Sequence, residues 1–184
     1  MTSAVVRISG LTKAYGHAEQ QVTVLSSVSL DLNPGEIVLL RGRSGSGKTT
    51  LLNVLAGWVD QDAGTVEWDG GGNAGDRRWH QVAIVPQTLG LLEELSIDEN
   101  VGLALRLGGV TSDDESGRVH GIMERFEIGH LLGRAIFECS LGERQRTAVA
   151  RALIVAPALL LADEPSAHQD LDRLHVVWSQ FREA

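Results

Sequence analysis

The chain has 184 residues, enough for one domain with a substantial hydrophobic core. Its formal net charge of −8 argues against a nucleic-acid-binding protein, which normally presents a basic face, so we expect no nucleic-acid partner. A single cysteine, Cys139, excludes an internal disulfide and indicates a reducing compartment. Because no apolar stretch is long enough to span a bilayer, any role at a membrane is expected to depend on a partner.

The first half of the sequence alternates strand signals with turn signals. Apolar residues alternate loosely with polar ones between Val24 and Leu32, as in a half-exposed strand. Residues 33–36 have the composition of a turn, and the apolar run at 37–40 predicts a buried strand. The predicted strands of this half are residues 5–8, 24–32, 37–40, 64–68 and 80–85, with a helix over residues 50–56.

The second half begins with a mainly helical pattern from about residue 89 to 156, with Ser96 and Thr111 as expected N-caps. Residues 158–162 form an apolar run that predicts another buried strand, and two adjacent carboxylates follow it. A last amphipathic helix is expected over about 170–181. The sequence therefore predicts an α/β core that is interrupted by a helical insertion.

Residues 42–49 read Gly-Arg-Ser-Gly-Ser-Gly-Lys-Thr and fit the phosphate-binding pattern G-x-x-x-x-G-K-[ST], here between a predicted strand and a predicted helix. The glycines let the backbone wrap around phosphate oxygens, while N–H groups and the helix N-terminus point at the anion. Lys48 is expected to contact the β- and γ-phosphates, and the hydroxyl of Thr49 to bind Mg²⁺. The predicted ATP-binding residues of this loop are Gly42, Arg43, Ser44, Gly45, Ser46, Gly47, Lys48, Thr49 and Thr50.

The two carboxylates after the strand at 158–162 are the usual partners of such a loop. Asp163 is expected to hold the Mg²⁺ shell through water, and Glu164 to orient or deprotonate the water that attacks the γ-phosphate. Since consecutive residues of a strand point to opposite faces, the two carboxylates can serve different ligands.

With these motifs the chain resembles the nucleotide-binding domain of ABC transporters over essentially its whole length. Tyr15 matches the aromatic residue of the family's A-loop, Gln87 the glutamine of the Q-loop, residues 139–146 the family signature, and residues 166–170 the D-loop. The resemblance implies that Tyr15 stacks on adenine. It also implies that Gln87 reaches Mg²⁺ and the attacking water, as a second catalytic residue beside Glu164.

The signature departs from the family's usual Leu-Ser-Gly-Gly-Gln at two positions, because Cys139 replaces Leu and Leu141 replaces the first glycine. The resemblance implies that Ser140 donates its hydroxyl, and Gly142 its backbone N–H, to the γ-phosphate bound by the opposite subunit. A helix that begins at Glu143 would direct its positive end at the same phosphate. We expect the branched side chain of Leu141 to crowd that approach.

The resemblance implies an α/β P-loop NTPase fold with a RecA-like parallel core sheet, an N-terminal antiparallel β subdomain and a helical insertion. A single ABC ATP-binding domain would span residues 1–184, with 1–87 and about 157–184 in the core and about 88–156 in the helical subdomain. The family's switch histidine and its C-terminal strand have no counterpart in the sequence. We therefore expect that the chain lacks a central strand, and that on its own it is poorly soluble or partly unfolded and nearly inactive as an ATPase.

The function implied by the resemblance is the ATP-binding subunit of an ABC transporter, with ATP and Mg²⁺ as cofactors. Two subunits, identical or related, would form a head-to-tail dimer on ATP binding, and membrane-spanning permease subunits would dock around residues 89–106. The subunit would then be peripheral, at the cytoplasmic face of the cell membrane. Within the family the chain is most similar to the lipoprotein-releasing and macrolide-exporter group. The alternatives are a nucleotide-binding fragment or regulatory subunit with degenerate or absent hydrolysis, and a soluble ABC ATPase without a transporter.

Overall fold

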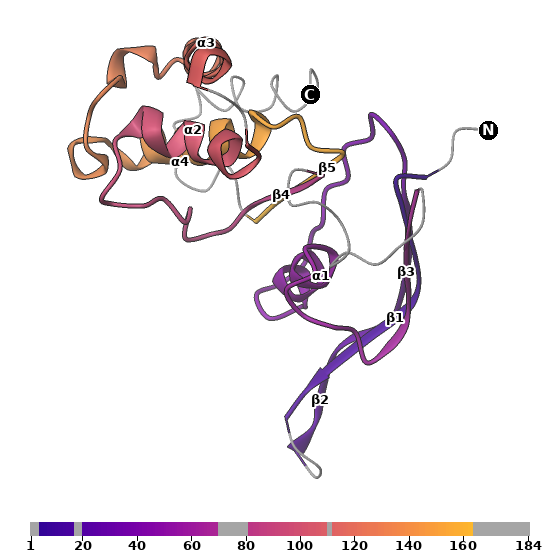
Figure 1. The fold of residues 1–184 in the computed structure, drawn as a ribbon. Helices are drawn as coiled ribbons and strands as arrows, with labels where there is room; N and C mark the ends of the chain where they lie inside the picture. Colours follow the sequence, from indigo (N-terminus) through magenta and orange to yellow (C-terminus); the bar gives the residue numbers. More distant parts are fainter. Residues whose placement is uncertain (1–3, 17–19, 70–80, 110–111, 164–184) are drawn as a thin grey trace. The chain divides into compact units, whose positions relative to one another are not determined.

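The chain folds as two compact units, Met1–Arg78 and Trp79–Ala184, and each is described by itself (Figure 1). Within the described residues, the first unit holds an antiparallel sheet and one α-helix, and the second holds a pair of parallel strands and a group of helices. These are the kinds of parts that the predicted fold contains, while the division into core and helical subdomain stays a prediction. The computed structural model describes residues 4–16, 20–69, 81–109 and 112–163.

The sheet of the first unit is centred on β1 (Val6–Tyr15), with β2 (Val22–Leu32) and β3 (Ala63–Trp68) antiparallel on its two sides. β1 is longer than the predicted 5–8 and continues to the candidate adenine-stacking tyrosine. The two outer strands agree with the predicted 24–32 and 64–68. β1 and β3 meet closely at Gly64, where φ is 86° and an added Cβ would lie 2.5 Å from the backbone of Gly10.

Residues 37–40 are not a strand, so the prediction of a buried strand there is wrong. No strand is assigned between residues 36 and 43. The side chains of Ile37, Val38 and Leu39 are 48%, 37% and 59% exposed. The reason is that an apolar run becomes a strand only beside a hydrogen-bonding neighbour, and both described sheets are built from other segments.

The segments on either side of this run agree with the sequence. The predicted turn at 33–36 is closed by the N–H of Glu36, which donates to the carbonyl of Asn33 at 3.2 Å. Helix α1 (Lys48–Leu55) begins two residues before the predicted 50–56. Its buried side chains belong to the hydrophobic core of the first unit, and they are Leu51, Leu52, Val54 and Leu55.

The second unit contains β4 (Val82–Val85) and β5 (Leu159–Ala162), which pair in parallel from Val82 opposite Leu159 to Val85 opposite Ala162. Both strands confirm the strands predicted from the apolar runs at 80–85 and 158–162. Because parallel strands need a long crossover connection, the residues between them can hold the helices of this unit.

Three helices lie within that crossover, α2 (Ile97–Leu107), α3 (Ser112–Arg125) and α4 (Leu141–Leu153) (Figure 1). Two short 3₁₀ turns, η3 (Gly129–Leu131) and η4 (Ile136–Glu138), connect α3 to α4. The helices enclose a hydrophobic core whose largest fully buried side chains include Ile97, Leu105, Met123, Phe126, Ile128 and Leu131.

The start of α2 confirms Ser96 as its N-cap. Ser96 Oγ accepts the N–H of Glu99 at 3.4 Å, and Glu99 Oε2 accepts the N–H of Ser96 at 2.8 Å. This reciprocal capping box satisfies two of the N–H groups that every helix start leaves without a partner. The other expected N-cap, Thr111, and the expected helix at 170–181 lie outside the described residues.

The loop before α2 is fixed by Asn100, whose side chain is fully buried. Its Oδ1 accepts the N–H of Leu92 at 2.9 Å, and its Nδ2 donates to the carbonyl of Leu92 at 2.9 Å. Nδ2 also lies within hydrogen-bonding distance of the carbonyls of Leu95, at 3.2 Å, and Ser96, at 3.0 Å. A buried amide with its polar groups satisfied in this way holds residues 92–96 in one conformation.

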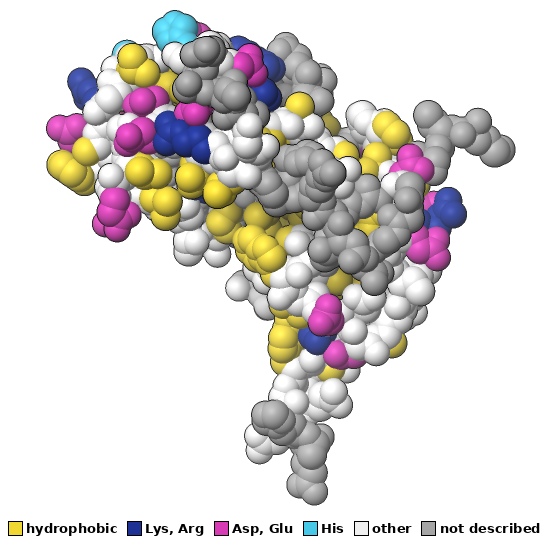
Figure 2. All heavy atoms as spheres, in the orientation of Figure 1, with side chains coloured by type: hydrophobic (Ala, Val, Ile, Leu, Met, Phe, Trp, Pro, Cys, Tyr) yellow, Lys and Arg dark blue, Asp and Glu magenta, His cyan; other side chains and the backbone are white. Residues whose placement is uncertain are grey.

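The described surface mixes side chains of every kind. On the face seen in Figure 2, acidic and basic groups are interspersed among hydrophobic side chains. Across the described ranges, no helix is both long enough and apolar enough to cross a membrane.

Candidate functional site

The predicted phosphate-binding loop, residues 42–49, leads directly into α1 in the first unit. Gly45 and Gly47 have φ of 78° and 90°, in the left-handed region that favours glycine, and the N–H of Ser46 donates to the carbonyl of Arg43 at 3.2 Å. Gly47 is the N-cap of α1 and supplies no side-chain cap. The first turn of the helix therefore presents backbone N–H groups that no N-cap side chain covers, as an anion site requires.

Two glycines allow close approaches in this loop, Gly42 to Ser46 within the loop and Gly47 to β2. A Cβ on Gly42 would lie 2.5 Å from Oγ of Ser46, and a Cβ on Gly47 would lie 2.8 Å from the carbonyl oxygen of Val24. A Cβ on Gly42 would require the Ser46 side chain to move, and a Cβ on Gly47 would require movement of the loop or of β2. The glycines therefore leave backbone groups of the turn uncovered by side chains, and this fits the phosphates of a nucleotide.

Lys48 extends its ammonium back across the loop. Nζ donates to the carbonyls of Gly42 at 3.0 Å and Arg43 at 3.1 Å. An ammonium has three N–H donors, so these two bonds place the charge at the loop and leave capacity for an anion. Thr49 is the next residue, in the first turn of α1, and it is exposed. Its hydroxyl oxygen is the hard donor type that Mg²⁺ prefers.

Tyr15 is the last residue of β1 and is 43% exposed. Lys13 Nζ lies over its ring, 5.5 Å from the centroid. Gly16 follows with φ of 108°, so the chain turns immediately after the tyrosine. Lys13 also forms an ion pair with Asp62 at 2.9 Å, a contact to which no signal in the sequence pointed.

Gln87 follows β4 in the second unit and is exposed. The next residues turn back, since the N–H of Leu89 donates to the carbonyl of Pro86 at 2.9 Å and Leu89 has a left-handed φ of 63°. Arg151 of α4 holds this turn by donating to the carbonyl of Leu89 at 2.8 Å and to that of Gly90 at 2.7 Å. The turn after Gln87 is thus tied to α4, the helix that begins within the signature, through Arg151, a residue that sequence reasoning missed.

The segment expected to receive a permease has a mixed character. Leu89 and Leu91 are partly buried against the hydrophobic core of their unit, whereas Leu92 is 44% exposed. Only part of this leucine run is therefore core, and Leu92 remains on the surface of the described residues.

The signature forms the N-terminus of α4, which begins at Leu141, two residues before the predicted Glu143. Ser140 is the N-cap, and its Oγ accepts the N–H of Glu143 at 3.3 Å while its hydroxyl donates to Glu143 Oε2 at 2.7 Å. The N–H of Ser140 donates to the same carboxylate oxygen at 2.8 Å. Cys139 is buried, so it occupies the place of the family's leucine as a small core residue.

The carboxylate of Glu143 accepts the hydrogen bond that the hydroxyl of Ser140 donates. Burial opposes ionisation of Glu143, but the hydrogen bonds from Ser140 and His130 outweigh it and lower the pKa below the usual 4.5. His130 Nε2 lies 3.3 Å from Glu143 Oε1. A hydroxyl carries one hydrogen, so Ser140 must release Glu143 before it can donate to a phosphate.

Beside it, Gly142 is partly buried and Leu141 is 46% exposed at the helix start, where crowding was expected.

Asp163 follows β5 directly and is 9% exposed, and its N–H donates to the carbonyl of Val85 at 2.9 Å. Because β4 and β5 are parallel, Gln87 and Asp163 both follow the carboxyl edge of the same two-stranded sheet. Glu164 and the candidate D-loop at 166–170 lie outside the described residues. No group of three or more His, Cys, Asp or Glu side chains suited to a metal ion occurs in the described part of the chain.

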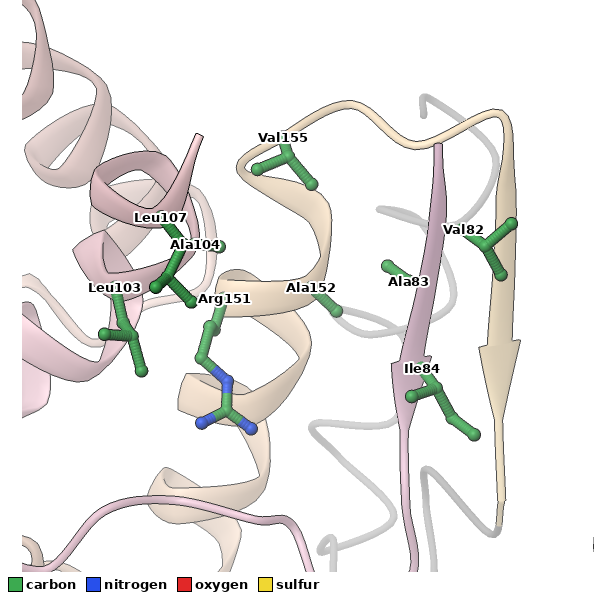
Figure 3. Close-up of a pocket in the computed structure, with 9 residues that line it drawn as sticks. All are labelled: Val82, Ala83, Ile84, Leu103, Ala104, Leu107, Arg151, Ala152 and Val155. Atoms are coloured by element: carbon green, nitrogen blue, oxygen red, sulfur yellow. The ribbon is translucent and has the colours of Figure 1, made fainter. Parts of the chain in front are cut away.

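An open pocket of about 250 Å³ lies between α2, α4 and β4 (Figure 3). Its lining is apolar except for Arg151, whose guanidinium already binds the carbonyls of Leu89 and Gly90. A nucleotide site needs groups that recognise phosphates, so this pocket is a poor candidate for one. The remaining lining residues are Val82, Ala83, Ile84, Leu103, Ala104, Leu107, Ala152 and Val155.

The sequence is similar to those of known proteins. The ABC transporter family profile matches residues 25–167. The lipoprotein-releasing system ATP-binding protein LolD of Geobacter metallireducens is 36% identical over 183 residues, which cover 94% of this chain and 81% of that protein. Its counterpart from Pseudomonas syringae pv. tomato is 39% identical over 175 residues, with 91% and 77% covered. The predicted similarity to the lipoprotein-releasing group agrees with both.

A solved structure gives the same picture of the fold. The dimeric structure of a post-hydrolysis state of the ATP-binding cassette MJ0796, bound to ADP and Pi, superposes with a TM-score of 0.85 at 27% identity. The match covers 95% of this chain and 80% of that one. It confirms the predicted P-loop NTPase fold. The chain therefore belongs to the ABC transporter family, as an ATP-binding subunit that hydrolyses ATP.

Proposed function

We propose that the loop at residues 42–49 binds the phosphates of ATP, with Lys48 on the β- and γ-phosphates and Tyr15 against the adenine. The observation that carries this proposal is the glycine-lined turn at the N-terminus of α1 with the Lys48 ammonium held across it at 3.0 and 3.1 Å. Backbone N–H groups, a helix N-terminus and a mobile cation are the three elements that cradle a polyphosphate.

Mg²⁺ would be held by Thr49, Gln87 and, through water, Asp163, since hydroxyl, amide and carboxylate oxygens are its preferred ligands. The ion would neutralise charge on the β- and γ-phosphate oxygens as the bond to the γ-phosphate breaks. Glu164 would orient the attacking water and take its proton, with Gln87 contacting the same water.

The subunit would work as a head-to-tail dimer in which Ser140, Gly142 and the start of α4 near Glu143 contact the γ-phosphate bound by the other subunit. Support comes from the dimeric state named for the similar cassette and from the exposed position of Ser140 at a helix N-terminus. The names of the lipoprotein-releasing relatives make a permease of that type the first membrane partner to test. Such a partner would hold the subunit at the cytoplasmic face of the membrane.

ATP-dependent dimerisation of the Glu164→Gln variant tests the proposal. The amide cannot act as a base, and loss of general-base catalysis typically slows a reaction by about 10²–10⁴-fold, so ATP should persist in the complex. Sedimentation should then report a dimer with Mg-ATP and a monomer with Mg-ADP. Adding Ser140→Ala should remove the dimer, because it deletes the hydroxyl that would reach the phosphate.

Ser96→Ala is the matched control, since Ser96 caps α2 with the same capping box but lies outside the signature. Loss of either cap should lower stability by about 0.5–2 kcal/mol. Only the Ser140 change should abolish the dimer. A Glu164→Gln variant that stays monomeric in ATP, or an equal loss with Ser96→Ala, would contradict the proposed role of the signature.

A further inference from the structure

The ring of Tyr15 has one face beneath a fixed cation. Lys13 Nζ lies 5.5 Å from the ring centroid, and the Lys13 side chain is only 14% exposed although the residue stands near the C-terminal end of β1. The chain contains two lysines, and the other one is Lys48 of the phosphate-binding loop. A compact ammonium on a flexible stem keeps such a position only if another group holds it.

Asp62 is that group. Its Oδ1 accepts from Lys13 Nζ at 2.9 Å, its Oδ2 accepts the backbone N–H of Ala14 at 2.7 Å, and its own N–H donates to the carbonyl of Thr12 at 2.9 Å. Asp62 follows the end of α1 and precedes β3. It therefore joins the chain after the phosphate-binding helix to the last residues of β1, directly before Tyr15.

A second ion pair that also involves β1 supplies a comparison. Arg7 and Asp31 form an ion pair of 3.3 Å near the other end of β1 and β2, with side chains 56% and 50% exposed. That pair is solvated, and among the described residues the Asp31 carboxylate accepts from the Arg7 guanidinium and from no backbone N–H. The Asp62 carboxylate is instead divided between an ammonium and a main-chain donor, an arrangement that fixes geometry.

We propose that Asp62 and Lys13 are positioning residues for the base of ATP: Asp62 fixes the end of β1 and holds the Lys13 ammonium against one face of the Tyr15 ring, so that adenine stacks on the other face. The inference rests on the proposed stacking role of Tyr15. The hydrogen bond from Lys13, and then that from Ala14, lower the pKa of Asp62 below the usual 3.8, so the carboxylate is ionised at neutral pH.

Calorimetric titration of the full chain with two probes, ATP and inorganic tripolyphosphate, separates the base from the phosphates. Tyr15→Ala should weaken ATP binding by about 5- to 150-fold, the range for loss of one base–aromatic stack, and leave tripolyphosphate unchanged. Asp62→Asn and Lys13→Met should each weaken ATP by about three- to tenfold, again without effect on tripolyphosphate. Asp31→Asn and Arg7→Met, the matched changes in the solvated pair, should alter neither probe.

The single tyrosine gives a readout of position that does not depend on binding. With ring-¹³C-labelled tyrosine, one set of NMR signals reports Tyr15, and Asp62→Asn should shift it in the nucleotide-free chain while Asp31→Asn should not. In the double variant Tyr15→Ala/Asp62→Asn, ATP should bind no more weakly than in Tyr15→Ala alone, because Asp62 acts through the ring.

The outcomes distinguish this inference from the proposed function. Unchanged ATP affinity in Tyr15→Ala would remove the stacking role itself. A loss in Tyr15→Ala with none in Asp62→Asn or Lys13→Met would overturn the positioning role alone. An equal loss of ATP and tripolyphosphate binding in Asp62→Asn would also overturn it, because the residue would then be supporting the fold of the unit.

Discussion

Lys48 illustrates how one side chain is prepared for its ligand before the ligand arrives. Its ammonium rests on two carbonyl oxygens of its own loop, those of Gly42 and Arg43. These bonds restrict the four-carbon stem to the region where a phosphate would lie, so less side-chain entropy is lost on binding. A guanidinium at the same position is planar and larger and would not fit the same pair of carbonyls.

Replacement of Lys48 by Ala should weaken ATP binding by about tenfold to a hundredfold. Charge-assisted hydrogen bonds contribute about 1.5–3 kcal/mol each, and the variant loses at least one to a phosphate oxygen. Titration calorimetry with ATP measures the change, and Lys48→Arg should recover only part of the affinity. ATP binding that is unchanged in Lys48→Ala would contradict the phosphate-binding role of the loop.

At the level of elements, features set by residues close together in the sequence could be predicted, and features that depend on contacts with distant residues could not. Ser96 and the glycine pattern at 42–49 act within a few residues of themselves, and both were identified from the sequence. The run at 37–40 has the composition of a strand but no hydrogen-bonding neighbour in the described sheets, so composition misled. Arg151 and Asp62 bind groups that are 61–62 and 48–49 residues away in the chain, and no short pattern records such contacts.

Arg151 should connect the turn after Gln87 to α4. Without its two hydrogen bonds the left-handed Leu89 loses the contacts that hold it, so Arg151→Met should cost about 1–3 kcal/mol of stability. We expect proteinase K to cleave near residues 87–92 faster in this variant, and ATP turnover to fall more than ATP affinity. Urea denaturation, timed digestion and steady-state ATPase assays measure the three effects.

Arg118→Met provides the comparison for that experiment. Arg118 also donates from its guanidinium to a carbonyl in the second unit, that of Ile154, at 2.8 Å, but within the described residues it forms no hydrogen bond with the turn at 87–90. It should lower stability by a similar amount while cleavage near 87–92 stays slow. Equal digestion of the two variants would refute the connection between Arg151 and Gln87.

The whole molecule should lose stability in acid through three carboxylates. The pKa of Asp62 is lowered from 3.8, chiefly by Lys13, and that of Glu99 from 4.5, chiefly by the N–H of Ser96. The pKa of Glu143 is lowered from 4.5 as well, where bonds from Ser140 and His130 exceed the opposing effect of burial. A folded-state pKa below the unfolded value stabilises the protein fully above the unfolded value, and this stabilisation is lost as pH falls through the folded value.

The urea midpoint should therefore be insensitive to these groups above about pH 5 and fall steadily below about pH 4.5. The combined variant Asp62→Asn/Glu99→Gln/Glu143→Gln should have a lower midpoint at pH 7 and a shallower decline in acid. Asp31→Asn serves as the control, because its ion pair with Arg7 is exposed, with side chains 50% and 56% accessible, and exposed pairs contribute little to stability. A triple variant with the same acid decline as the wild type would assign that decline to other groups.

The buried side chain of Asn100 has a consequence for how the loop before α2 meets solvent. By accepting the N–H of Leu92 and donating to its carbonyl, both at 2.9 Å, the amide imitates a residue of a neighbouring antiparallel strand. The Leu92 amide should thus exchange its proton for deuterium as slowly as the interior of α2, although it belongs to no helix or strand. In Asn100→Ala that protection should disappear at Leu92 and persist within α2. Hydrogen exchange monitored by NMR would measure both. Slow exchange at Leu92 would show that a connecting loop can be protected like a β-strand by one side chain, without a second strand beside it.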